Sequence, residues 1–143
     1  AAPAARATQP LLAVVSSNPL DAEIINELKS VSQRAEFFPA LLHEASVDMQ
    51  RCGEQIRHAL AMHDHSCVRD AAHALKGVSA NVGAQRCLAL ANRLMSASRT
   101  DLEESAERLS VDLGDALQVT LAALRQEIAA AGGTRSADGT TTL

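Results

Sequence analysis

Apolar residues recur at intervals of three and four along most of the chain, which is the spacing of one face of an α-helix. The alternating pattern of a β-strand does not extend over a useful length anywhere. The pattern therefore predicts an all-α protein. The longest apolar stripes are Phe38, Leu41, Leu42, Ala45, Met49, Cys52, Ile56 and Leu60 in one segment, and Leu102, Ala106, Leu109, Leu113, Leu117, Leu121, Leu124 and Ile128 in another.

Residues that favour helix starts set the expected boundaries. Asn18 followed by Pro19 is typical of a helix start, and so is Asp64 before the third apolar segment. Thr100, with Glu103 three positions later, has the spacing of a capping box. We therefore expect helices over residues 18–32, 35–62, 65–81, 84–97 and 100–131.

Glycines are expected to end two of these helices. Gly83 follows the third helix, and Gly132-Gly133 follows the fifth. Because the connections are short, successive long helices should pack as antiparallel neighbours. The predicted fold is an antiparallel up-down four-helix bundle with a short extra N-terminal helix at one end. We expect a linker over residues 1–17, the bundle over 18–131 and a flexible tail over 132–143.

Composition and charge exclude some classes of function. The chain has 143 residues, enough for one domain with a core, and only 1% of them are aromatic. The formal charge is -4 and no run of Lys and Arg stands out, so we expect no nucleic-acid partner. No apolar stretch approaches the roughly 18 residues that a membrane span needs. We therefore expect no membrane insertion of this segment.

Histidine and cysteine residues give little support for a metal site. The run His63-Asp64-His65-Ser66-Cys67 contains suitable ligand types, but zinc normally needs four convergent ligands and no second cluster is present. We interpret this run as a loop and helix cap, and predict no metal site. Cys52, Cys67 and Cys87 lie beside apolar residues, which favours small buried side chains over disulfides.

The third helix carries the residues of chemical interest on its exposed side. On a helical wheel with about 100° per residue, its apolar stripe lies about 180° from His73. Arg69, Lys76, Gly77 and Ala80 fall within about 60° of His73. The stripe that should face the core consists of Val68, Ala71, Leu75, Val78 and Val82.

Gly77 indicates an open surface beside His73. Glycine inside a helix costs about 1 kcal/mol relative to alanine, and the packing stripe does not require it here. Residues four apart are neighbours on a helix surface, so Gly77 leaves space beside the imidazole. The small side chain of Ala80 projects little from the next turn of the helix. The side chain of Lys76 can extend back beside the ring. This group suits an imidazole that a bulky partner must approach and that must carry an anion.

Phosphoryl transfer fits these requirements. Imidazole is a good nucleophile near neutral pH because its free pKa is about 6.5. A phosphoryl group on a ring nitrogen stays reactive, and Lys76 would offset its charge. The chain has no P-loop, no kinase-type glycine-rich loop and no carboxylate cluster for Mg²⁺. We infer that His73 takes and gives phosphoryl groups, and that a partner supplies the metal and the acidic residues.

The segment Ala72-His73-Ala74-Leu75-Lys76-Gly77, followed by Ser79-Ala80-Asn81-Val82-Gly83, resembles the signature of histidine-containing phosphotransfer (HPt) domains. The similarity is specific over residues 72–83 and looser over about 20–131. Members of this family are four-helix bundles, fused at the C-terminal end of hybrid sensor histidine kinases or standing alone in phosphorelays.

The resemblance implies roles for individual residues. His73 would accept a phosphoryl group from the aspartate of a receiver domain and pass it to the aspartate of a second receiver. Lys76 and Gly77 match the family's lysine and glycine. Docking is expected on the outer face around His73, including Arg69 and Ala80.

Partners, cofactors and location follow from the same resemblance. The partners would be receiver domains of the same hybrid kinase and of a response regulator. No cofactor is expected in this domain, and Mg²⁺ is expected on the receiver. No independent kinase activity is expected, because the module only forms a phosphohistidine intermediate. The expected location is the bacterial cytoplasm, with tethering to the inner membrane through the parent kinase.

Two positions depart from the family pattern. Val78 stands where many members carry a small residue. Met95 stands where some members place a Gln or Glu that hydrogen-bonds the histidine ring. Two alternatives stay open: a substrate module that the kinase domain of a chemotaxis-type histidine kinase phosphorylates, and a non-catalytic docking bundle whose histidine is not used.

Overall fold

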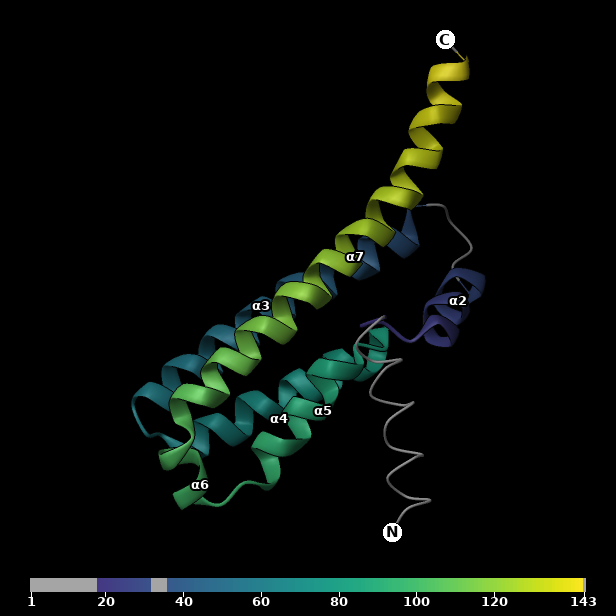
Figure 1. Cartoon of the computed structure of the whole chain (residues 1–143). Coiled ribbons are helices and arrows are strands. Elements are labelled where there is room, and N and C mark those ends of the chain that lie inside the picture. Colours follow the sequence, from purple (N-terminus) through teal and green to yellow (C-terminus); the bar gives the residue numbers. More distant parts are fainter. Residues whose placement is uncertain (1–17, 32–35, 143) are drawn as a thin grey trace.

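The computed structural model describes the backbone of residues 18–31 and 36–142, and their side chains as far as residue 131. These residues form helices, shown in Figure 1, with an isolated backbone bridge between Leu20 and Ala84. The predicted all-α class is confirmed. The helices are α2 (Ala22–Val31), α3 (Phe37–Ala61), α4 (His65–Val82), α5 (Gln85–Ser96), α6 (Arg99–Glu104) and α7 (Ala106–Thr142).

Four of the described helices, α3, α4, α5 and α7, enclose the hydrophobic core (Figure 1). Helix α3 packs against α4 and α7, and α5 packs against the same two helices, so the four close around one interior. The short helix α2 packs against α4. The predicted four-helix bundle with an extra N-terminal helix is confirmed. Fully buried side chains come from each bundle helix, and each contributes about 1.5–3 kcal/mol: Leu42, Met49, Ile56, Leu75, Leu94, Leu113 and Leu124.

Both ends of α4 are held as the sequence predicted. Asp64 is the N-cap, and its carboxylate accepts a hydrogen bond from the backbone N–H of Cys67 at 3.1 Å. This satisfies one of the donors that the first turn of a helix leaves unpaired. Gly83 ends the helix with a left-handed φ of 69°, which glycine adopts without steric cost. The backbone N–H of Asp21 donates to the carbonyl of Gly83 at 2.7 Å, which attaches the segment before α2 to this turn.

The first helix starts later than predicted. The side chain of Asn18 accepts a hydrogen bond from the backbone N–H of Leu20 at 3.1 Å, which forms a turn rather than a helix start. Leu20 then bridges to Ala84, so the backbone at this point is extended. Helix α2 begins only at Ala22, where the carboxylate of Asp21 accepts from a backbone N–H of the first turn.

The predicted fifth helix is two helices. The N-cap of α6 is Ser98, whose hydroxyl accepts a hydrogen bond from the backbone N–H of Asp101 at 3.1 Å. The predicted capping box at Thr100 is wrong, because Ser98 offers the same hydroxyl chemistry two residues earlier and leaves Thr100 inside α6. Ser105 then separates α6 from α7.

The glycine pair Gly132-Gly133 does not end the last helix. Helix α7 continues through both residues to Thr142, so the predicted helix end is wrong. Glycine lowers helix propensity by about 1 kcal/mol, but it remains compatible with helical dihedral angles. The predicted linker over residues 1–17 lies outside the described residues. The flexibility expected for residues 132–143 stays a prediction.

Gly53 allows α3 and α7 to approach each other closely. This residue is buried in the middle of α3, and a Cβ atom built on it would overlap the Cδ1 atom of Leu117 on α7. Leu117 is itself buried, so its side chain would have to shift within the packed interface. Glycine at this position therefore lets the two long helices pack without displacing Leu117.

We expect Gly53→Ala to lower the free energy of unfolding by about 1 kcal/mol. Overpacking a core costs about 1–3 kcal/mol, which outweighs the helix propensity that alanine gains. Urea unfolding followed by circular dichroism measures the change. A variant at least as stable as the wild type would show that α3 and α7 are not in close contact at this point.

Candidate functional site

Helix α4 positions the candidate site by being packed on two sides. It lies between α3 and α5, which leaves only its outward face exposed. His73 is near the middle of α4 and is exposed. Every other residue predicted to share its face is exposed as well: Arg69, Lys76, Gly77 and Ala80.

The buried side of α4 is wider than the predicted stripe. Four of the five stripe positions are buried, but Val78 is only half-buried. Ala72 and Ser79 are buried in addition. The stripe is wider because α4 packs against both α3 and α5, and also contacts α2. The prediction of Val78 as a core residue is therefore only partly right, and its side chain borders a groove described below.

Gly77 faces open space. No atom outside its own helix backbone lies within 4 Å of the position that a Cβ would take. This is the opposite of Gly53, whose missing side chain is required by packing. The fold therefore gives no packing reason for glycine at position 77, and its effect is to leave the surface beside His73 low.

The charged groups of the site are available to a partner. Among the described residues, none forms a hydrogen bond or ion pair with the side chains of Arg69, His73 or Lys76. Each ring nitrogen of His73 can therefore meet an incoming group. The two cations lie on either side of His73 along the helix, where they favour an anion on the ring.

Met95 is part of the packed interior of the bundle. Its side chain is half-buried and packs against the hydrophobic core. A thioether is only a weak hydrogen-bond acceptor, so it cannot replace the amide or carboxylate that some family members use at this position. Within the described part of the chain, the ring of His73 has no hydrogen-bond partner that orients it.

The other histidine and cysteine residues have structural surroundings. His65 Nε2 lies 3.1 Å from Glu103 Oε1, which links the start of α4 to α6. The sequence pattern could not show this contact, because it joins two helices that are distant along the chain. Among the residues with described side chains, no group of three or more His, Cys, Asp and Glu residues could hold a metal ion.

All three cysteines are free thiols, which confirms the prediction against disulfides. Burial raises the pKa of the Cys52 thiol. Burial also raises the pKa of the Cys87 thiol, against a smaller opposing effect from its hydrogen bond to Thr120 Oγ1 at 3.4 Å. Both thiols therefore stay protonated near neutral pH and are poor nucleophiles. Cys67 is only half-buried.

The family model for the Hpt domain matches residues 40–131, which include the whole of α4 and α5 and most of α3. The chain belongs to the Hpt domain family. It is thus a histidine-containing phosphotransfer domain of the kind used in two-component signalling.

A solved structure supports the same assignment. The crystal structure of histidine-containing phosphotransfer protein B (HptB) from Pseudomonas aeruginosa PAO1 is similar to this Hpt domain, with a TM-score of 0.59 and 26% sequence identity. The match covers 77% of this chain and 94% of HptB. No curated protein matched the chain. None of the described helices of this Hpt domain combines the length and apolar character that crossing a membrane requires.

We expect Gly77→Ala to raise the free energy of unfolding by about 0.5–1 kcal/mol. Alanine favours the helix, and its methyl group would meet no atom at this position. Urea unfolding followed by circular dichroism again provides the measurement. Gly53→Ala is the matched control, because it makes the same change inside a helix and is expected to have the opposite effect on the free energy of unfolding. A loss of stability would mean that Gly77 has a packing role that the structure does not contain.

Proposed function

We propose that His73 carries the phosphoryl group of this Hpt domain in a phosphorelay. In this proposal it accepts the group from the aspartyl phosphate of one receiver domain and passes it to the aspartate of a second. The observation that carries the proposal is an exposed imidazole without a described partner, next to the open space at Gly77.

The transfer needs only the imidazole on this side of the complex. The lone pair of a neutral ring nitrogen attacks phosphorus, and a nitrogen–phosphorus bond forms. The bond between phosphorus and the aspartyl oxygen breaks, and the carboxylate leaves with the electron pair. The other ring nitrogen keeps its proton, so the phosphorylated ring is cationic and remains a good leaving group for the return step.

Lys76 and Arg69 assist by charge. The phosphoryl group brings negative charge to an exposed surface, where each nearby cation contributes a modest attraction that salt weakens. Lys76 lies three positions after His73, at a spacing that places both side chains on neighbouring parts of the helix surface. We propose that it offsets the charge of the phosphoryl group while the domain is phosphorylated.

The partners in this proposal supply the remaining parts. The receiver brings the reacting aspartate, its acidic neighbours and Mg²⁺. The parent protein is a bacterial hybrid sensor kinase, and the domain acts in the cytoplasm as its phosphotransfer module. The resemblance of the α4 signature to modules of such kinases supports this assignment.

We expect His73→Gln to abolish phosphoryl transfer from a phosphorylated receiver domain, because the amide is not a nucleophile at neutral pH. The free energy of unfolding should change by less than about 0.5 kcal/mol, since the side chain is exposed and unpaired. Radiolabelled phosphate on the domain measures transfer, and its acid lability and alkali stability identify phosphohistidine. Labelling that persists in the variant would refute the assignment of His73.

The same assay separates the proposal from its alternatives. A domain that binds receivers without accepting phosphate would be a docking bundle. A domain that is labelled by an ATP-binding kinase domain of its own chain, and by no receiver, would be a chemotaxis-type substrate module. Labelling of His73 by a receiver supports the phosphorelay.

We expect Gly77→Gln to slow transfer from a receiver by about tenfold or more without unfolding the bundle. The larger side chain fills the space through which the receiver must reach the ring, and a misplacement of about 1 Å can cost 100-fold in rate. Ala129→Gln, at an exposed position on α7, is the matched control and should transfer at the wild-type rate. Equal rates for both variants would contradict the role given to Gly77.

A further inference from the structure

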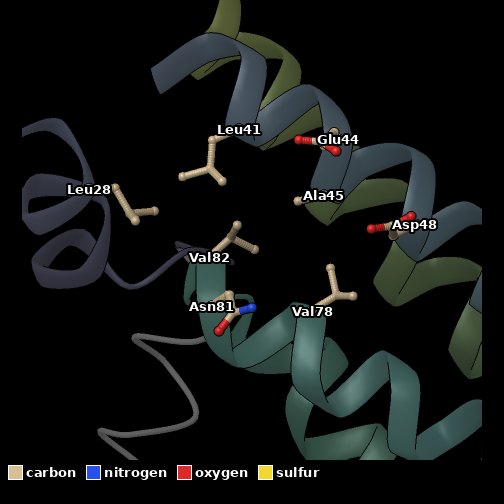
Figure 2. A pocket seen from close by; sticks show the side chains of 8 residues that line it. All are labelled: Leu28, Leu41, Glu44, Ala45, Asp48, Val78, Asn81 and Val82. Carbon is tan, nitrogen blue, oxygen red and sulfur yellow. The ribbon is translucent and has the colours of Figure 1, made fainter. Parts of the chain in front are cut away.

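A groove lies beside the site, between α2, α3 and α4 (Figure 2). Its volume is about 340 Å³. Figure 2 shows that its apolar side chains come from all three helices, whereas its two carboxylates both come from α3. The lining residues are Leu28, Leu41, Glu44, Ala45, Asp48, Val78, Asn81 and Val82.

A second hollow continues the groove along α3. It has a volume of about 400 Å³ and shares Leu41 and Glu44 with the first groove. Phe37, which lines it, is 47% exposed, so an apolar surface extends from α4 to the start of α3. Glu44 stands at the junction of the two hollows.

The groove is close to His73. A helix rises about 1.5 Å per residue, so Val78 and Asn81 lie roughly 7.5 Å and 12 Å further along α4. On the helical wheel Asn81 is about 80° from His73, on the same side as Gly77. The open space beside Gly77 therefore lies on the side of His73 that faces the groove.

We expect a partner centred on His73 to cover part of this groove. A complex at the upper end of the weak, transient class buries about 600 Å² on each partner, which corresponds to a disc of roughly 14 Å radius. Such a disc centred on His73 extends beyond α4. The two other grooves described, one between α3 and α7 and one among α5, α6 and α7, contain no residue of α4.

The charges across this footprint have opposite signs. Arg69 and Lys76 place positive charge beside His73, whereas Glu44 and Asp48 place negative charge on the α3 edge of the groove. Asp48 forms an ion pair with Arg51 on its own helix, which offsets its charge. Glu44 is exposed and has no ion pair among the described residues. Of the two groove carboxylates, it is therefore the one better able to meet a cation from a partner.

We propose that Glu44 is a specificity residue of this domain, which selects receivers that carry a Lys or Arg at the edge of an apolar docking surface. The inference rests on the proposed function, since it concerns the partner of the same site. The receiver's acidic centre would face Arg69 and Lys76, its apolar side chains would enter the groove, and its cation would meet Glu44. A receiver with an acidic residue at that edge would face like-charge repulsion.

Glu44→Lys in the full chain tests the proposal, with Glu54→Lys as the matched control. Glu54 is exposed on the same helix but lines a groove between α3 and α7, and both changes alter the net charge equally. The probe is a receiver domain phosphorylated by acetyl phosphate, first shown to transfer to the wild-type chain. Its edge Lys or Arg is changed to Glu in a second version. Circular dichroism establishes that each variant is folded.

We expect Glu44→Lys to slow transfer from the basic-edged receiver by about tenfold at low salt, with a smaller effect at high salt. Glu54→Lys should stay within about twofold of the wild type. The Glu-edged receiver should transfer poorly to the wild type and recover with Glu44→Lys. Equal rates for the two lysine variants with both receivers would overturn the role of Glu44 while leaving His73 as the carrier. Failure of every receiver to label the wild type would instead overturn the proposed function and, with it, this inference.

Discussion

The packing of α4 between α3 and α5 is the constraint on which the site depends. Neighbouring helices bury one side of α4, and its two ends are held by the Asp64 cap and the left-handed turn at Gly83. His73 therefore stands on a rigid element although its own side chain is unrestrained. The two-receiver transfer that we propose would gain from this arrangement, because the backbone is fixed while the ring can adapt to each partner.

The two helical glycines illustrate how the same residue serves opposite purposes. Gly53 is a packing residue, since a side chain there would overlap Leu117 in the core. Gly77 faces solvent and lowers the stability of its helix without a packing benefit. A destabilising residue at an exposed position is most simply explained by what it allows to approach, which here is the partner that reaches His73.

Phosphoryl transfer requires little from this domain beyond an imidazole that a partner can reach. In the proposed function the imidazole supplies the nucleophile, the neighbouring cations offset the transferred charge, and the receiver supplies the remaining groups. Selectivity must then come from the surface around the ring. The acidic edge of the α3 groove and the basic residues on α4 separate negative from positive charge across this surface. In our proposal this separation favours one orientation and one class of receiver. Such charges influence association rates and partner choice more than they influence affinity.

The sequence by itself determined the helical class, the bundle, the caps at Asp64 and Gly83, and the exposed face of His73. These features follow from local periodicity and from short-range hydrogen bonds, which a sequence pattern contains. The choice of Ser98 over Thr100 as a cap and the continuation of α7 past Gly132-Gly133 were not predicted, because competing local preferences there differ by only about 1 kcal/mol.

Only the tertiary structure decided what lies beside the site. The half-burial of Val78, the contact of His65 with Glu103 and the position of Glu44 across the groove from α4 all depend on how separate helices pack. Glu44 and Val78, which are 34 positions apart, line the same groove, and His65 and Glu103, which are 38 positions apart, are in contact. The periodicity within one helix cannot predict such pairs. The sequence thus points to the residue that we propose to react, while the fold determines which surface lies beside it.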